Sequence, residues 1–250
     1  MIYLITPTGA RKDQFELCAF YMYRQTYTGQ VTWVIIDDAD PLSTNNVKTD
    51  FRENWTICKV YPKPTWKGEN TQARNIAAGI SLIENNEDIE AIFIIEDDDY
   101  YKPYYIEKML EHLKGFDIAG EKNTIYYNVK HRRYLTNPNN LHSSLFQTVF
   151  TKNALPALKK AYSHKFIDCM LWSLVKNKNL FNDHNLSVGI KSLPGRGGIG
   201  AGHIGMLGFP FDENLKYLKT LTSEEDAEKY RRYYSDSRVL QHSQFNQKRR

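Results

Sequence analysis

The sequence lacks most of the features that mark secreted, membrane-spanning or disordered proteins. It has only three cysteines in 250 residues, without metal-type spacing, so we expect neither a disulfide framework nor a zinc knuckle. No stretch approaches the roughly 18 apolar residues of a membrane span, and the apolar run at 1–6 is too short for a signal peptide. The 14 glycines and nine prolines are too few for a fibrous chain. These absences predict a soluble, cytoplasmic, globular protein.

Charge is nearly balanced as well. The 33 Lys and Arg residues exceed the 29 Asp and Glu residues by a net charge of +4, which leaves room for an anionic ligand but names no partner. Aromatic residues make up 13% of the chain, and 17 residues are tyrosine. Tyrosines line sites for sugars and bases because a flat apolar face carries a polar tip, although amphipathic packing is their commoner use.

Short β-branched runs alternate with helical patterns along the first half of the chain. Strands are predicted over 2–6, 31–36, 56–61 and 89–95, and helices over 13–25, 70–82 and 104–113. The second half is less regular, with predicted strands at 118–119, 124–129 and 144–150, helices at 153–162 and 167–175, a loop-rich stretch at 182–211 and a capped helix from Ser223 to about 234. The alternation predicts an α/β fold with a mostly parallel central sheet.

Polar side chains follow the predicted strands at the points where they end. These are Thr6, Thr8 and Arg11 after the first strand, Asp37 and Asp38 after the second, and the acidic run Glu96-Asp97-Asp98-Asp99 after the fourth. Ligands of open α/β sheets bind at such carboxyl ends. Four adjacent acids repel one another, so a hard cation, Mg²⁺ or Mn²⁺, is expected there with positions open for substrate phosphates. The alternatives are a solvated acidic turn at 96–99 and an Asx turn at 37–38.

Five segments in this order resemble the nucleotide-diphospho-sugar transferases of the GT-A fold, particularly glycosyltransferase family two. They are Ile5-Thr6-Pro7-Thr8 with Arg11, Gln25-Thr26-Tyr27, Val34-Ile35-Ile36-Asp37-Asp38, Ala73-Arg74-Asn75, and the acidic run with Pro103 four residues after Asp99. The resemblance covers about 1–115 and is loose beyond it. It implies a single GT-A domain over 1–250, with a nucleotide-sugar-binding half at 1–115, an acceptor-side half at 116–212 and a C-terminal helix and basic tail at 213–250.

The resemblance also assigns expected roles around the nucleotide. Thr6, Thr8 and Arg11 would line the nucleotide pocket. Asp38, with Asp37 as the alternative, would accept a hydrogen bond from the base, and Arg74 would approach the base or the diphosphate.

The acidic run can be aligned with the family's metal-binding motif in two ways. Alignment on Pro103 selects Glu96, Asp98 and Asp99, whereas a plain Asp-x-Asp reading selects Asp97 and Asp99. Asp99 belongs to both and is the predicted ligand of Mn²⁺ or Mg²⁺, while Asp97 and Asp98 share the ribose or sugar contacts. Some of the tyrosines that follow should line the pocket; these are Tyr100, Tyr101, Tyr104 and Tyr105.

An acidic residue that opens a helix under the acceptor site is the family's usual base, and Asp168 lies in such a segment. We therefore predict that Asp168 takes the proton of the acceptor hydroxyl. Ile167 stands where the family often has a second acid, and the alternative is that Asp168 is only a helix N-cap.

The glycine-rich stretch 195–203 formally contains the dinucleotide fingerprint, but Pro194 precedes it and no predicted helix follows. We expect its Arg196 to face a diphosphate and His203, with His184 as second choice, to be a further metal ligand. A loop histidine held by hydrogen bonds is the alternative.

These features together predict a metal-dependent glycosyltransferase. It would move a sugar from a UDP- or other nucleoside-diphosphate sugar to an acceptor hydroxyl, with inversion, and the acceptor would be a glycan or a hydroxymethylated base in phage DNA. The basic stretch 130–133 would contact a DNA backbone or form a charged hairpin edge. Two alternatives stay open: a sugar nucleotidylyltransferase, for which residues 7–11 are a poor phosphate loop, and a non-catalytic carbohydrate- or nucleic-acid-binding module.

Overall fold

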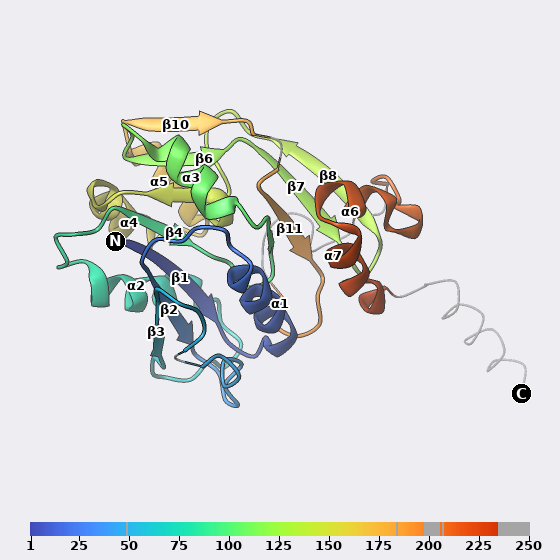
Figure 1. Ribbon diagram of the computed structural model, residues 1–250, viewed down its shortest axis with the longest axis horizontal. Helices are drawn as coiled ribbons and strands as arrows, with labels where there is room; N and C mark the ends of the chain where they lie inside the picture. The colour runs from blue at the N-terminus through green and yellow to red at the C-terminus, as the bar shows by residue number, and fades with distance from the viewer. Residues whose placement is uncertain (49, 184, 198–205, 207, 235–250) are drawn as a thin grey trace, which may run out of the picture.

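The computed structural model describes residues 1–48, 50–183, 185–197, 206 and 208–234 (Figure 1). In this part of the chain a seven-stranded sheet has the order β10-β6-β9-β4-β1-β2-β3, and a four-stranded sheet has the order β5-β11-β7-β8. The larger sheet comprises β1 (Ile2–Thr8), β2 (Val31–Asp37), β3 (Trp55–Val60), β4 (Ala91–Ile94), β6 (Ile118–Glu121), β9 (Thr148–Phe150) and β10 (Lys178–Phe181). The smaller comprises β5 (Tyr100–Tyr101), β7 (Asn123–Asn128), β8 (Arg133–Pro138) and β11 (Ser187–Lys191).

The central strands of the larger sheet run parallel, as the sequence predicts. β1 pairs in parallel with both β2 and β4, and β2 pairs in parallel with β3. Only β9 reverses direction within this sheet, since it is antiparallel to β4 and to β6, whereas β10 is parallel to β6. Thr8 lies opposite Asp37, so the polar residues that end β1 and β2 meet at one edge.

Helices cover both faces of the larger sheet, which explains why every residue of β1 is buried. The helices are α1 (Lys12–Tyr23), α2 (Gln72–Ile83), α3 (Tyr105–Leu113), α4 (Leu155–Ala161), α5 (Ile167–Leu174), α6 (Lys216–Leu221) and α7 (Glu224–Lys229). Successive side chains of β1 point to opposite faces, so Leu4 packs in the core beneath α1 and Ile5 in the core beneath α2. Gly79 lets α2 approach closely, because a Cβ there would lie 2.7 Å from Ile36 Cδ1.

The smaller sheet begins with β5, a strand of only two residues that directly follows the acidic run and pairs with β11. β11 also pairs in parallel with β7, whose other neighbour is β8. This arrangement carries Lys191, the last residue of β11, back to the end of β4. The sequence did not predict it: β11 falls in the stretch expected to be loop-rich, and β5, β8, β10 and α6 were also not predicted.

Two further sequence predictions differ from the structure. The strand predicted at 144–150 is a strand only at Thr148–Phe150, because Leu145–Gln147 form a turn of 3₁₀ helix. The helix predicted to run from Ser223 to about 234 ends at Lys229 and is followed by a 3₁₀ turn at Arg231–Tyr233. The predicted division into segments at 115 and 212 stays a prediction. Within the described residues, we find no helix with the length and apolarity needed to span a membrane.

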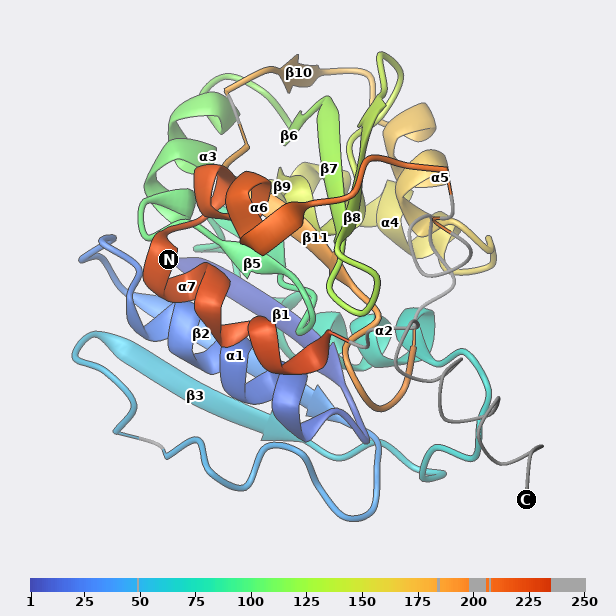
Figure 2. The ribbon, with the colours of Figure 1, turned by 90° about the vertical axis from the view of Figure 1, so that its right-hand side faces the viewer.

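Near the end of its described part, the chain returns to α1, and α7 lies beside that helix (Figure 2). Ser223 caps α7, as predicted, by accepting a hydrogen bond from the Asp226 backbone N–H. The Asp226 side chain is fully buried and accepts from Arg24 Nη1 of the segment after α1 at 2.7 Å. The Tyr21 and Tyr230 hydroxyls also lie 2.7 Å apart. Buried polar contacts therefore fix α7 in place.

Replacing Asp226 with Ala should lower the free energy of unfolding by about 2–3 kcal/mol, because charge-assisted hydrogen bonds to a buried carboxylate are lost. Chemical denaturation measures this loss. Glu225→Ala is the matched control, since Glu225 is an exposed neighbour on the same helix turn that pairs only with Lys229 among the described residues. Equal stability of the two variants would contradict the anchoring role.

Candidate active site

A cavity of about 460 Å³ opens at the carboxyl ends of β1 and β4. Elements from both halves of the chain contribute its walls. The lining includes Pro7, Thr8 and Arg11 after β1, Trp66 and 68–72 before and at the start of α2, Glu96, Asp97 and Asp98 after β4, Tyr126 of β7, 144–146, 165–168 at the start of α5, Lys191, Arg196 and Gly197. The cavity thus brings together Thr8 and Arg11, from the end of β1, with Glu96, Asp97 and Asp98, from the end of β4.

The acidic run is held from one side by residues that follow β1. Thr8 Oγ1 donates to Asp97 Oδ2 at 2.6 Å. Arg11 places one guanidinium nitrogen 3.3 Å from Asp97 Oδ1 and another 2.7 Å from Asp98 Oδ2. Thr8 and Arg11 both line the cavity, and they orient two of the four carboxylates.

Lys191 holds the acidic run from the other side. Its ammonium lies 3.0 Å from Asp99 Oδ1 and 3.9 Å from Asp98 Oδ2. The aromatic rings of Tyr126 and Phe146 flank it, with the nitrogen 5.5 and 5.6 Å from the ring centres. A lone lysine is exposed by default, but this one is almost fully buried. Nothing in its local sequence shows this, because burial depends on the pairing of β11 with β5 and β7.

Burial and mutual repulsion raise the pKa values of carboxyl groups in this cluster. Burial raises the pKa of Glu96 to about 7, and the nearby Asp98 and Asp168 charges add to the rise against the attraction of Lys191. Burial, with repulsion from Asp98, raises the pKa of Asp97 to about 6 despite Arg11. The pKa of Asp99 is raised by burial in the same way. For Lys191 burial acts to lower the pKa, but the carboxylates outweigh it and raise the value.

The donor set of the acidic run suits a hard cation. Glu96, Asp98 and Asp99 each offer a carboxylate oxygen within 4.8 Å of the others. Asp99 Oδ2 is buried and accepts no hydrogen bond from any described residue, while Oδ1 accepts from the Ile190 N–H and Lys191. Asp99 nevertheless does not line the cavity, whereas Glu96 and Asp98 do. These three residues are the set that alignment on Pro103 selects from the sequence, and they include the predicted Asp99.

Asp38 is the centre of a second cluster, at the end of β2. Its carboxylate accepts from Arg74 Nη2 at 3.0 Å, Asn75 Nδ2 at 2.8 Å and Arg196 Nη1 at 3.0 Å, and also from the Thr71 hydroxyl. Asp38 is buried beneath these groups and does not line the cavity, whereas Arg196 does. The Arg196 guanidinium lies over the Trp66 ring, 4.5 Å from its centre. In this arrangement Arg196 covers the carboxylate that was predicted to meet the base.

Two residues predicted to line the nucleotide pocket are directed elsewhere. Asp37 accepts hydrogen bonds from the Ser43 and Thr44 N–H groups at 2.6 and 3.1 Å and shapes the loop after β2. This is the Asx-type alternative that the sequence left open. Thr6 is fully buried and accepts from the Trp33 indole N–H at 2.9 Å, beneath α1. Thr6 and Thr8 share one face of β1, because side chains alternate with a period of two, but Thr6 lies further from the strand end and is held in the core by Trp33, so it does not line the cavity.

Asp168 lies at the start of α5 and lines the same cavity as the acidic run. It is the second residue of the helix, so it is not the N-cap that the sequence offered as the alternative, and its Oδ1 accepts from the Cys169 N–H at 2.9 Å. Its charge is close enough to Glu96 to raise the pKa of that residue. The structure therefore brings the predicted base beside the predicted cation site.

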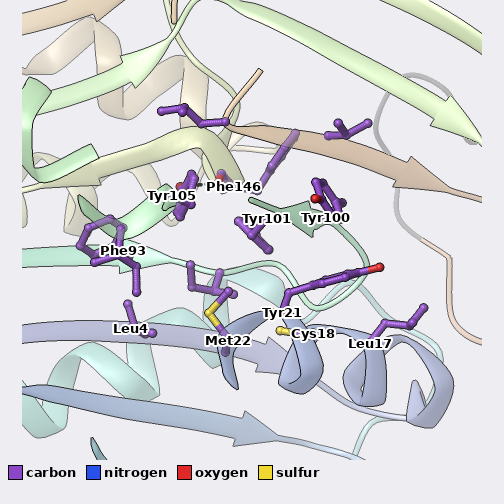
Figure 3. Close-up of a cluster of buried hydrophobic side chains, with 14 of the residues drawn as sticks. Leu4, Leu17, Cys18, Tyr21, Met22, Phe93, Tyr100, Tyr101, Tyr105 and Phe146 are labelled. Atoms are coloured by element: carbon purple, nitrogen blue, oxygen red, sulfur yellow. Dashed lines mark hydrogen bonds between the residues drawn. The ribbon is translucent and has the colours of Figure 1, made fainter. Parts of the chain in front are cut away.

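The tyrosines that follow the acidic run do not line the cavity, and that expectation was wrong. Tyr100, Tyr101 and Tyr105 are buried in the core beneath α1, with Tyr21 and Phe146 (Figure 3). The Tyr101 and Tyr105 rings meet edge-on, 4.9 Å apart. Tyr104 is exposed and also outside the lining. The strand β5 turns these side chains inward, and Tyr126 lines the cavity instead.

The remaining sequence predictions concern two loops. His203 and His184 both lie outside the described residues. The basic stretch 130–133 forms the hairpin between β7 and β8, where Arg132 packs 3.8 Å from the Tyr234 ring centre and Arg133 donates to the Phe209 carbonyl. None of its residues lines the cavity. This is the charged hairpin edge rather than a wall of the site.

Comparison with solved structures finds the same architecture in TarS of S. aureus, a GT-A-type glycosyltransferase. The structure of TarS 1–349 matches with a TM-score of 0.56 and 10% identity, covering 76% of this chain and 60% of that chain. Its complex with UDP matches at 0.54 with 10% identity over the same shares of the two chains. Its complex with UDP-GlcNAc matches at 0.55 and 12%, covering 77% and 59%. The chain has the GT-A fold.

The GT-A fold prediction from the sequence is thus confirmed. This chain spans about 60% of the length of those TarS chains. No family model and no curated protein matches the sequence.

Lys191→Met should leave the acidic run short of one compensating charge and lower the free energy of unfolding by about 3 kcal/mol in metal-free buffer. Mn²⁺ should restore part of this loss, because a bound cation replaces the missing positive charge and stabilises the folded state. Denaturation with and without Mn²⁺ measures both effects. Lys108→Met, at an exposed lysine paired with Glu111, is the control and should change stability by about 0.5 kcal/mol or less. A loss no larger than the control's would show that Lys191 does not compensate the cluster.

Proposed function

We propose that the protein is a metal-dependent glycosyltransferase that moves a sugar from a nucleoside-diphosphate sugar to an acceptor hydroxyl. One observation carries the proposal. A single cavity of the GT-A fold is lined by Glu96 and Asp98, two of the three carboxylates suited to a divalent cation, and by a separate carboxylate, Asp168, on another element. A nucleotidylyltransferase or a binding module gives no reason for the second carboxylate at that place.

The nucleotide end of the donor is proposed to lie between α2 and the 194–197 segment. Arg196 lines the cavity there and stacks on Trp66, while Asp38 and Thr71 hold its guanidinium. We infer that Asp38 acts by positioning Arg196 and Arg74 rather than by touching the base, and that Arg196 faces the base or diphosphate. A UDP-sugar is the first candidate donor, because TarS structures of the same fold contain UDP and UDP-GlcNAc.

Mn²⁺ or Mg²⁺ would be held by Glu96, Asp98 and Asp99. When bound, such an ion neutralises the charge that develops on a leaving nucleoside diphosphate. Arg11 and Lys191 keep the carboxylates in place through contacts of 2.7 and 3.0 Å and hold two positive charges near the diphosphate. Asp97, tied to Thr8 and Arg11, is left to face the ribose or sugar.

Asp168 is proposed to take the proton from the acceptor hydroxyl as that oxygen attacks the sugar. Its Oδ1 accepts from the Cys169 N–H, which fixes the carboxylate at the cavity wall. In a single displacement the acceptor attacks the face opposite to the leaving diphosphate, so the configuration of the sugar is inverted. The lining of the same cavity includes the aromatic side chains of Tyr126 and Phe166 and the hydroxyl group of Ser144. Such a wall suits a sugar ring, so we propose a glycan-type acceptor.

A thermal-shift series tests the donor and the metal together. UDP-GlcNAc, UDP-glucose and GDP-mannose are each added with Mn²⁺, with Mg²⁺ and with EDTA. At a ligand concentration 100 times the dissociation constant, the native state gains about 2.7 kcal/mol, so the melting temperature should rise with the correct donor. EDTA should remove most of the rise. No shift with any nucleotide sugar in the presence of Mn²⁺ would contradict the proposed function.

Asp168→Asn should keep the donor-induced thermal shift and lower the transfer rate by about 10²–10⁴-fold, because the amide cannot accept the proton. Transfer to water, measured as release of UDP from the preferred donor, reports the rate when no acceptor is known. Asp88→Asn, at an exposed loop position remote from the cavity lining, is the control and should leave the rate unchanged. A normal rate for the Asp168 variant would remove this residue from the mechanism.

A further inference from the structure

A second group of metal-binding side chains lies at the rim of the cavity and is separate from the acidic run. It consists of His142, in the loop before the 3₁₀ turn at Leu145–Gln147, and Asp168 and Cys169 at the start of α5. One potential ligand atom from each lies within 4.8 Å of the others. His142 and Cys169 do not line the cavity, whereas Asp168 does, so Asp168 belongs to both places.

The donor set is that of a borderline-soft transition metal. Imidazole nitrogen, thiolate sulfur and carboxylate oxygen are the ligands of zinc, whereas the acidic run offers only oxygen. On a tetrahedral ion with Zn–S of about 2.3 Å and Zn–N of about 2.0 Å, the sulfur and nitrogen stand roughly 3.5 Å apart. The Cys169 Sγ lies 3.4 Å from His142 Nε2. These two side chains are therefore already spaced as a pair of zinc ligands.

The backbone on both sides of the group is fixed by local hydrogen bonds. Asn139 Oδ1 accepts from the N–H groups of Leu141 and His142 at 3.0 and 3.2 Å, which sets the direction of the loop that carries His142. Asp168 and Cys169 are consecutive residues of the first turn of α5. A metal that joins them to His142 would need only side-chain adjustments.

We propose that His142, Asp168 and Cys169 form a site for Zn²⁺ or a similar transition-metal ion, with water at the fourth position. The Cys169 thiol loses its proton to solvent when the metal binds. Because the site uses the Asp168 carboxylate, the bound ion prevents that group from taking a proton from the acceptor. Zn²⁺ at this site is thus an inhibitor of transfer; this second half of the proposal rests on the proposed function, and the binding itself does not.

Co²⁺ is the probe for binding, since a cysteine thiolate ligand gives a charge-transfer absorption band in the near ultraviolet. Metal-free protein titrated with Co²⁺ should develop this band at one equivalent, and Zn²⁺ should abolish it. Cys169→Ser should lose the band, and His142→Ala should weaken Co²⁺ binding by at least about tenfold. Cys58→Ser, which removes a partly exposed thiol on β3, and Asp98→Asn, which alters the acidic run, should both keep it.

The inhibitory role is measured with saturating Mn²⁺ and the donor found in the thermal-shift series. Zn²⁺ should suppress UDP release, and the Zn²⁺ concentration for half inhibition should rise at least tenfold in Cys169→Ser, relative to that variant's own rate without zinc. The Cys58→Ser protein should be inhibited like the unmodified one.

The outcomes separate the site from the proposed function. Absence of the thiolate band, or its persistence in Cys169→Ser, overturns the site. A band with no UDP release from any donor leaves the site standing and contradicts the proposed function instead. A band together with UDP release that Zn²⁺ suppresses equally in Cys169→Ser supports the site and overturns its inhibitory role.

Discussion

Compensation of charge within the acidic run is the constraint on which the rest of the site depends. Four consecutive acidic residues follow a fully buried strand, and three of them are themselves buried. An uncompensated buried charge costs about 3–5 kcal/mol, so the fold must supply positive groups at this point. It does so from opposite directions, with Arg11 from the segment after β1 and Lys191 from the end of β11. The smaller sheet is needed at this position because it delivers Lys191.

The same constraint underlies the proposed binding of a cation and an anionic ligand. Two positive side chains do not neutralise four carboxylates, and burial, together with repulsion from Asp98, raises the pKa of Glu96 and of Asp99. A divalent ion would relieve this repulsion, and the arginine and lysine would then be available to the phosphates. Asp38 repeats the principle at the end of β2, where one buried carboxylate gathers two arginines. Negative charge at strand ends thus positions positive charge at the cavity wall.

Asp168 links the cavity to the proposed metal site at its rim. Its carboxylate lines the cavity beside Glu96, and the same carboxylate stands next to the Cys169 thiol and the His142 ring. The acidic run offers only oxygen ligands, whereas the group at the rim offers nitrogen, sulfur and oxygen. The two groups would therefore prefer hard and softer metal ions, respectively. Because Asp168 belongs to the rim group and also lines the cavity, an ion bound at the proposed rim site would also change a carboxylate of the cavity wall.

The sequence by itself determined the parallel half of the sheet and the polar strand ends, and the resemblance of its five motifs to a known family implied the GT-A fold. The sheet and its strand ends depend on local signals: continuous apolar runs at 33–36 and 91–95, helical periodicity between them, and acids immediately after the strands. Tertiary structure alone decided the rest. Lys191 meets Asp99 across 92 residues of sequence, and Arg196 meets Asp38 across 158, through pairings that no local pattern encodes. The tyrosines after the acidic run turned inward because β5 pairs with β11, and Thr6 is kept from the cavity because it is buried against Trp33 of the neighbouring strand. Which side chain faces the cavity is a matter of strand register and long-range packing, and those are set only when the chain folds.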